Sequence, residues 1–404
     1  MKEQMKFYGK HPSVLWTIPW AMVGQFRKFW NSRKLSAILR ECLENAGLTM
    51  KKKVEVPDWS KGGTKVEERI IYPDVKIEAD EHNFYFHIRM LPGHTRKMWE
   101  GKVDAIAQAM FGKVVKSDIG EGCVKLVVQY KKYDVSKVLY KDDLEPYIWI
   151  GYGDSELIKW KFNSDPHLML VGTTGSGKST FVRQLITQFP EEWDLRICDG
   201  KYVEFTSLER LGFPVATSKE QFVQFVGDAR KEVDRRFHIL RQEGKNEYTQ
   251  LGFRPVFLLI DEFIFLIEEL STKKEDGKTE KDRVFSDLRD IALRGRAAGV
   301  FLILVFQRPD ASYLPTVIRD NMMCKIVLKG SKTAFEMAFG DEGKGLEPLE
   351  MGQGYVKFSG HPEVFSFPNY ELEQFKKDMI ERRGMEIKEV ERKTPEGVFE
   401  PESP

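Results

Sequence analysis

Apolar runs and stretches of helical periodicity alternate from about residue 148 to residue 370. Five short apolar runs predict buried strands, at His167–Val171, Asp194–Asp199, Pro255–Ile260, Val300–Phe306 and Met323–Leu328. Intervening stretches such as Phe181–Phe189 have the spacing of helices. Strands that alternate with helices are typical of parallel strands joined by crossover helices. The pattern therefore predicts an α/β domain with a mostly parallel sheet over residues 148–370.

A different pattern precedes this domain, over residues 54–147. Arg69–Ile77 and the alternating Asn83–Met90 predict strands, and a helical stripe that begins at Trp99 ends near Gly112. Two further β-like runs follow, at Lys113–Lys116 and Cys123–Tyr130. Short strands mixed with one helix predict a small α+β domain. Its histidines do not cluster with acidic residues at a spacing that indicates a metal site.

The two ends of the chain differ from both domains. Residues 1–53 carry eleven Lys or Arg and three Asp or Glu, a net charge of +8, whereas the rest of the chain carries −7. Apolar residues recur at helical spacing from Leu35 to Ala46, so we predict a basic N-terminal helical segment. Its basic face would contact phosphates or acidic lipid, or simply be solvated. Residues 371–404 predict one helix followed by a disordered Pro- and Glu-rich tail.

The apolar stretch Val14–Phe26 is the candidate membrane segment. Its thirteen residues would form a helix of about 20 Å, too short for a hydrocarbon core of about 30 Å. It would lie in a membrane interface or pack on a protein surface instead. The four cysteines lie far apart without a CxxC pair, which favours a reducing compartment. We therefore expect a cytoplasmic protein and leave peripheral membrane association open.

Composition narrows the functional classes. Of 404 residues, 41% are hydrophobic, and 63 Lys or Arg nearly balance 62 Asp or Glu. These proportions exclude a disordered or collagen-like chain. The net charge of +1 means that nucleic-acid binding would have to come from local basic patches.

One motif has a phosphate-binding pattern. The G-x-x-x-x-G-K-[ST] pattern is matched by Gly172, Thr173, Thr174, Gly175, Ser176, Gly177, Lys178 and Ser179. A predicted strand precedes it and a predicted helix follows, which is the context that a P-loop requires. Backbone N–H groups and the helix N-terminus would bind phosphates, Lys178 would reach the outer phosphates, and Ser179 would hold Mg²⁺. Thr180, the next residue, belongs to the same predicted site.

Further candidate residues follow two of the other strands. Asp261 and Glu262 end the run that begins at Pro255, so Asp261 would organise Mg²⁺ and Glu262 would polarise the attacking water. Gln307 follows the run Val300–Phe306 and is our candidate sensor of the γ-phosphate. Arg294 and Arg296 stand just before that run. Either would stabilise the transferring phosphoryl group in a neighbouring subunit, or form an ordinary surface ion pair.

These motifs, in this order and spacing, resemble the motor domain of the FtsK/SpoIIIE family of DNA translocases. The similar stretches are His167–Thr180, Cys198–Lys201 with Glu204, Phe257–Glu262, Ala292–Pro309, and Ile318–Asn321 onward to Met351–Gly354. The segment Arg89–Thr95 is similar to the one before the motor in transfer proteins of conjugative plasmids and integrative elements of Gram-positive bacteria. One departure is Asp-Gly-Lys at 199–201, where relatives usually have Asp-Pro-Lys.

The resemblance implies a RecA-like P-loop motor domain that uses ATP and Mg²⁺ and assembles as a hexameric ring around duplex DNA. It implies Lys178 and Ser179 as phosphate and Mg²⁺ ligands, and Asp261 and Glu262 as the Walker B pair. It also implies Gln307 as sensor and Arg296 as the arginine supplied in trans, with Arg294 as the alternative. A relaxase or a membrane-bound transfer protein would be a further partner.

We therefore expect an ATP-driven DNA translocase that moves the DNA of a mobile genetic element. One alternative is a ring ATPase that pumps protein substrates, which DNA-stimulated ATPase activity would distinguish. Another is a DNA-binding or replication-accessory protein that uses nucleotide only to assemble. Glu262 argues against this second alternative, because a nucleotide-binding scaffold has no need of a residue that activates water.

Overall fold

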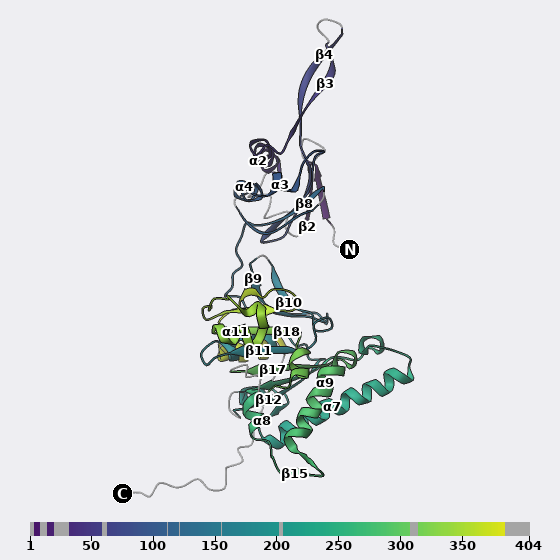
Figure 1. Cartoon of the computed structure of the whole chain (residues 1–404), viewed down its shortest axis with the longest axis vertical. Helices are drawn as coiled ribbons and strands as arrows, with labels where there is room; N and C mark the ends of the chain where they lie inside the picture. The colour runs from purple at the N-terminus through teal and green to yellow at the C-terminus, as the bar shows by residue number, and fades with distance from the viewer. Residues whose placement is uncertain are drawn as a thin grey trace, which may run out of the picture. The chain divides into compact units, whose positions relative to one another are not determined.

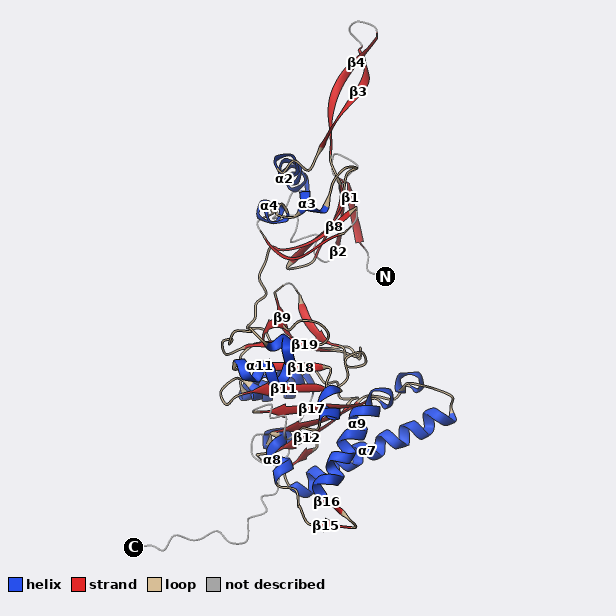
Figure 2. Cartoon of the chain, viewed as in Figure 1, coloured by secondary structure: helices blue, strands red, loops and turns tan. Residues whose placement is uncertain are grey.

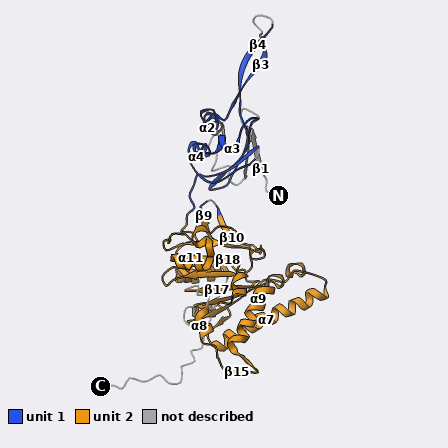
Figure 3. Ribbon diagram, in the orientation of Figure 1, with its two compact units in different colours: residues 1–134, 154–156 blue, residues 135–153, 157–404 orange. Residues whose placement is uncertain are grey.

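The computed structural model describes residues 4–8, 14–19, 32–58, 63–110, 112–120, 122–154, 156–201, 205–307 and 314–383. The chain forms two compact units, residues 1–134 with 154–156, and residues 135–153 with 157–404 (Figure 3). Among the described residues, the first unit has one cluster of buried apolar side chains and the second has two. Each unit therefore has its own hydrophobic core.

The first unit contains a six-stranded sheet in the order β1-β2-β5-β6-β8-β7. Its strands are β1 (Gln4–Tyr8), β2 (Val14–Pro19), β5 (Asp74–Ala79), β6 (Asn83–Arg89), β7 (Lys113–Ile119) and β8 (Cys123–Gln129). Its helices are α2 (Ser32–Asn45), α3 (Arg96–Trp99) and α4 (Val103–Ala109) (Figure 2). Alternate residues of β5 and β6, such as Ile77 and Phe86, are buried with Leu39 and Leu43 of α2. Period-two burial gives the sheet one core face.

The N-terminal apolar stretch differs from expectation. Val14–Pro19 is the strand β2, which pairs antiparallel with β1 and parallel with β5. The interpretation of this stretch as an interfacial helix is therefore wrong for residues 14–19, and residues 20–26 lie outside the described part of the chain. Pairing on both sides satisfies backbone groups that a helix would bond internally, and Val14, Thr17 and Ile18 are β-branched residues that favour strands. Within the described ranges, no helix is long and apolar enough to cross a membrane.

The first unit also crosses the boundary expected at residue 53. Leu39, Leu43 and Leu48 belong to its core, so α2 is part of this unit. A separate two-stranded ribbon follows α2, made of β3 (Met50–Asp58) and β4 (Gly63–Ile71). Its described side chains are mostly exposed. The strand expected over Arg69–Ile77 is divided at Pro73, which has no backbone N–H for a sheet.

The second unit contains a ten-stranded sheet in the order β10-β9-β20-β19-β18-β11-β17-β14-β12-β13. Its strands are β9 (Ile148–Gly153), β10 (Leu157–Trp160), β11 (Leu168–Gly172), β12 (Asp194–Asp199), β13 (Val215–Ala216), β14 (Val256–Asp261), β17 (Val300–Phe306), β18 (Cys324–Leu328), β19 (Gln353–Lys357) and β20 (Glu363–Ser366). The six strands from β18 to β13 are parallel, and the other four are antiparallel. This confirms the predicted α/β class, and each of the five predicted strands lies within one residue of its expected bounds.

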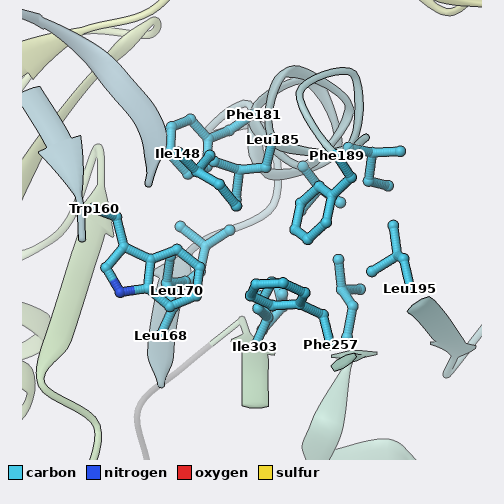
Figure 4. Close-up of a cluster of buried hydrophobic side chains, with 14 of the residues drawn as sticks. Ile148, Trp160, Leu168, Leu170, Phe181, Leu185, Phe189, Leu195, Phe257 and Ile303 are labelled. Carbon is cyan, nitrogen blue, oxygen red and sulfur yellow. The ribbon is translucent and has the colours of Figure 1, made fainter. Parts of the chain in front are cut away.

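Helices cover both faces of this sheet. They are α5 (Lys178–Ile186), α6 (Thr206–Arg210), α7 (Lys219–Gln242), α8 (Phe263–Glu268), α9 (Glu280–Ala298), α10 (Thr316–Asp320), α11 (Lys332–Phe339) and α12 (Leu372–Arg383), with 3₁₀ turns η2 (Tyr248–Leu251) and η3 (Gly340–Gly343). On one face, Phe181 and Leu185 of α5 pack with Phe257 (Figure 4). On the other, α7 and α9 lie side by side over Leu258 and Leu302 (Figure 1). Burial of both faces explains the nearly continuous apolar runs in the sequence.

The Lys- and Glu-rich segment Ser271–Arg283, which follows α8 and includes the first turn of α9, has regular structure. Its strands β15 (Lys274–Glu275) and β16 (Lys278–Thr279) pair as a short hairpin. Asp276 and Gly277 both have positive φ in the turn, which suits a two-residue hairpin. Thr279 then caps α9, with its hydroxyl accepting from the backbone N–H of Asp282.

Candidate functional site

The P-loop connects the end of β11 to the start of α5. Gly177 is the N-cap of α5 at φ 93, and a Cβ there would lie 3.2 Å from the Phe367 ring, so glycine suits this position. Lys178 donates from Nζ to the carbonyl oxygen of Gly172 at 2.9 Å, which folds its side chain back over the loop. The loop lines a cavity of about 260 Å³ together with Lys201 and Met351. The amides at the start of α5 therefore border an open cavity.

The residues of this cavity fit the phosphates of a nucleotide. Beside the cavity, in the same loop, the hydroxyl of Ser176 is buried without a hydrogen-bond partner among the described residues, and a phosphate oxygen would satisfy it. A Cβ at Gly172 would collide with that hydroxyl, so glycine keeps the cradle open. Ser179 lines the cavity, and Asp261, at the end of β14, offers a carboxylate. These oxygen donors suit Mg²⁺, which prefers carboxylate, hydroxyl and phosphate oxygens.

Glu262 follows β14 in a left-handed backbone conformation, with φ 48 and ψ 47. This conformation is uncommon for a residue other than glycine and costs about 1–3 kcal/mol, so the surrounding contacts must hold it. Its Oε1 accepts a hydrogen bond from Nε2 of Gln307 at 2.7 Å. The same oxygen lies 3.0 Å from Nζ of Lys201 and 3.9 Å from Nζ of Lys178. The carboxylate is thus buried among three donors and aimed at the P-loop.

The strand order explains why Gln307 reaches Glu262. In the sheet, β17 lies between the P-loop strand β11 and the acidic strand β14. Gln307 directly follows β17, so it stands at the carboxyl edge between Lys178 and Glu262. The structure therefore brings together four residues that the sequence singled out separately: Lys178, Asp261, Glu262 and Gln307.

The turn after β12 adds Lys201, a residue whose role sequence reasoning missed. The carboxylate of Asp199 accepts from the backbone N–H of Lys201 at 3.0 Å and of Phe205 at 2.8 Å, which fixes the turn. A Cβ at Gly200 would lie 2.7 Å from the carbonyl oxygen of Asp261 and 2.8 Å from Cβ of Glu262. Glycine therefore lets this turn approach the acidic pair. The sequence did contain a signal for Lys201, because its turn follows the end of a predicted strand, as the pair Asp261 and Glu262 does.

The two arginines, Arg294 and Arg296, lie near the amino ends of the parallel strands, opposite the P-loop. Arg296 is in the last turn of α9, just before β17 begins, whereas Gln307 follows the end of β17. Seven residues of strand separate these ends by about 20 Å at ~3.3 Å per residue. Arg294 binds Asp234 at 2.9 Å and lies over the Phe237 ring. Arg296 is 59% exposed and 4.0 Å from Glu247. Arg296 therefore cannot reach the P-loop of its own chain.

His167, which precedes the P-loop strand, joins three elements. Its Nε2 donates to the carbonyl oxygen of Ala292 in α9 at 3.1 Å, and its Nδ1 accepts from the backbone N–H of Leu302 in β17 at 2.9 Å. Complete burial lowers the pKa of this histidine to about 4, so the ring is neutral. His167 thus ties the helix that bears Arg296 to the P-loop strand.

Known proteins resemble the chain in sequence. Residues 152–267 match the FtsK/SpoIIIE family model. The FtsK domain-containing protein YdcQ of Bacillus subtilis (strain 168) is 29% identical over 76% of this chain and 64% of its own length. The DNA translocase SpoIIIE of the same organism is 27% identical over 57% of this chain and 31% of its own length. The chain thus spans less than two thirds of the length of either relative.

Solved structures share the fold. The conjugation coupling protein TcpA of pCW3, solved in monomer form with ATPγS, superposes with a TM-score of 0.54 at 19% identity, covering 87% of this chain and 99% of TcpA. ATPases 2 and 3 of EssC from Geobacillus thermodenitrificans give a TM-score of 0.50 at 15% identity, covering 63% of this chain and 51% of EssC. Together with the site geometry, these similarities lead to one conclusion: the second unit has a P-loop α/β fold, and residues 152–267 resemble the FtsK/SpoIIIE family.

Proposed function

We propose that this protein is an ATP-driven DNA translocase that works as an oligomeric ring. The observation that carries the proposal is the buried Glu262 carboxylate, held by Gln307 and Lys201 beside the P-loop cavity. A nucleotide-binding scaffold needs the cavity but has no need of a positioned carboxylate. The names of the relatives, DNA translocases SpoIIIE and FtsK, support DNA as the substrate.

In this proposal the P-loop holds the phosphates of ATP. Lys178 exchanges its bond to the Gly172 carbonyl for the outer phosphates, and the Ser176 hydroxyl gains the partner that it lacks. The amides at the start of α5 supply further donors and a partial positive charge. Ser179 and Asp261 hold Mg²⁺, which neutralises developing charge on the β- and γ-phosphates.

Hydrolysis depends on Glu262. Its carboxylate orients a water molecule in line with the γ-phosphate and accepts a proton from it as the phosphoryl group transfers. Gln307 bonds the same oxygen and stands at the head of the segment that follows β17. Loss of the γ-phosphate would change the Glu262 contacts, and Gln307 would pass that change to the following segment.

The second charged group for the transition state comes from a neighbouring subunit. Arg296 is exposed at the sheet edge remote from its own P-loop, so we assign it to the site of the next copy. Each site is then completed only by assembly, and a hexamer around duplex DNA is the arrangement that we propose. Arg294 is the weaker candidate, because its guanidinium already binds Asp234.

The experiment that tests this function is the ATP hydrolysis rate per subunit with and without duplex DNA, on protein of measured oligomeric state. We expect duplex DNA to raise the rate several-fold, and single-stranded DNA to raise it less. An ATPase that is indifferent to DNA would favour the alternative of a ring that pumps protein substrates. Absence of turnover under all conditions would favour a protein that uses nucleotide only to assemble.

We further propose that the DNA belongs to a mobile genetic element, with a relaxase or a membrane-bound transfer protein as partner. The similarity in fold to a conjugation coupling protein over most of both chains motivates this assignment. Capture of a relaxase by the purified protein, in parallel with a chromosomal DNA-processing protein as control, would test it. Equal binding to both would leave no reason to prefer the mobile element.

A further inference from the structure

We infer that the exposed face of α9 docks onto α8 of a second copy of this chain, so that Arg296 enters the site beside Glu262. The inference rests on the proposed function, because it names the surface through which the neighbour completes the site. Every residue that it uses belongs to the second unit.

The donor surface is a stripe on α9. Arg289, Leu293 and Arg296 are all exposed, and their spacing of four and three residues places them on one side of the helix. Leu293 is 51% exposed, which is a large apolar area to leave in water between two arginines. Seven residues of helix give the stripe a length of about 10 Å. It therefore presents two positive charges with an apolar residue between them.

The acceptor surface lies beside the proposed catalytic residues. A cavity of about 280 Å³ is lined by Lys201, Glu262, Ile264, Phe265, Glu268 and Gln307. Phe265 is 47% exposed although it lies one turn from the buried Glu262. Glu268, at the end of α8, is also exposed. The cavity thus runs from the site, past an exposed aromatic ring, to a carboxylate.

The two surfaces match in register and in charge. Counted from Glu262, the acceptor surface has Phe265 three residues further along the chain and Glu268 six residues further. Starting from Arg296, the donor offers Leu293 after three residues and Arg289 after seven. At about 1.5 Å per residue, the donor stripe and the acceptor surface have nearly the same length. Their side chains line up when the two helices run antiparallel. Leu293 then packs on Phe265, and Arg289 pairs with Glu268.

A second copy is the occupant because the same chain carries both complementary surfaces. They lie on different elements, so the contact is head-to-tail and can close into a ring. Nucleotide should strengthen it. Without phosphates, the incoming Arg296 would meet Lys178 and Lys201, whose charges the Glu262 carboxylate only partly offsets. A bound γ-phosphate adds negative charge at this point and so strengthens the attraction for Arg296.

Charge reversal tests the contact. Arg289→Glu and Glu268→Arg should each weaken assembly with ATPγS by about tenfold in the midpoint concentration, and the double variant should recover most of the loss, as expected for a coupled pair. Sedimentation velocity would measure assembly. Arg241→Glu, an exposed position on α7, is the matched control and should assemble as wild type. Leu293→Ser should also weaken assembly while leaving ATPγS binding by the monomer unchanged.

The outcomes separate this inference from the proposed function. A wild-type protein that neither assembles nor changes its ATPase rate per subunit with concentration contradicts both. A wild type that assembles, with single variants that assemble equally well or a double variant that shows no recovery, contradicts the docking surface alone.

Discussion

Gln307 donates a hydrogen bond from its Nε2 to Oε1 of Glu262 at 2.7 Å, at the carboxyl ends of the neighbouring strands β17 and β14. The two residues are far apart in sequence and meet because β17 is inserted between the P-loop strand and the acidic strand. Glu262 has a left-handed backbone, so the hydrogen bond helps to hold an orientation that costs energy. This pairing connects the carboxylate that we propose as the activator of water to the residue that follows β17.

Glu262→Gln should abolish turnover while keeping ATP affinity, because the amide cannot accept a proton from water. We expect kcat to fall by about 10² to 10⁴, the range for loss of a general base. Lys178→Ala should instead weaken ATP binding itself, because in our proposal Lys178 binds the phosphates in the ground state. Equilibrium binding of ATPγS and steady-state hydrolysis would distinguish the two. Hydrolysis by Glu262→Gln at the wild-type rate would refute our site assignment.

Lys201→Ala should affect the triphosphate more than the diphosphate. Lys201 pairs with Glu262 and lines the P-loop cavity, so it can contact a γ-phosphate. Loss of one charge-assisted bond predicts about tenfold weaker ATPγS binding, with ADP binding unchanged. Lys219→Ala, which removes an ion pair with Glu280 outside the site, is the control. Equal losses for both nucleotides would point to general damage to the fold instead.

Stability should fall in mild acid because of His167. Burial lowers its folded-state pKa to about 4, below the unfolded value of about 6.5. The unfolded chain therefore binds the extra proton as pH falls from about 6.5 toward 4, and stability is lost over this window and not above it. At pH 5 the loss relative to pH 7 should be about 2 kcal/mol from this group. Urea unfolding of wild type and His167→Gln should show a smaller pH dependence in the variant. An identical dependence would mean that His167 is not buried as the neutral ring.

The second unit should fold when the first unit is removed. Removal of residues 1–134 should leave a folded ATPase, because the second unit has its own cores. Removal of residues 1–53 alone takes Leu39, Leu43 and Leu48 from the first core, at about 1.5–3 kcal/mol for each buried side chain. Limited proteolysis should then cleave residues 54–134 rapidly while the second unit persists. A first unit that stays resistant without α2 would contradict this account of its core.

Arg296→Ala should lower the turnover rate by a factor of about 10³ or more. ATP affinity should stay nearly intact. Mixed with Glu262→Gln subunits, the Arg296→Ala protein should recover activity, because one mutant keeps the carboxylate and the other keeps the arginine. The recovered rate of co-assembled subunits is the measurement. If the mixture stays inactive despite demonstrated co-assembly, the site is not shared, and Arg294→Ala should be compared next.

The sequence predicted the sheet of the second unit well for a physical reason. Strands buried on both faces, such as Val300–Phe306, appear in the sequence as continuous apolar runs. The helices between them are told apart by the polar residues of their exposed faces. Val14–Pro19 misled the interpretation because a short apolar run fits a strand as well as a helix, and its pairing with β5 depends on residues far along the chain. Lys201 was missed for a similar reason. Its role depends on the pairing of β12 with β14, which sets Asp199 opposite Asp261.

The most direct test of the central claim is displacement of a triplex-forming strand from duplex DNA by the wild-type protein. If ATP hydrolysis at this site moves the protein along DNA, the third strand should be released with ATP, and not with ATPγS or by Glu262→Gln. Duplex DNA that stimulates hydrolysis while the third strand stays bound would show that the ATPase does not translocate, and would contradict the account.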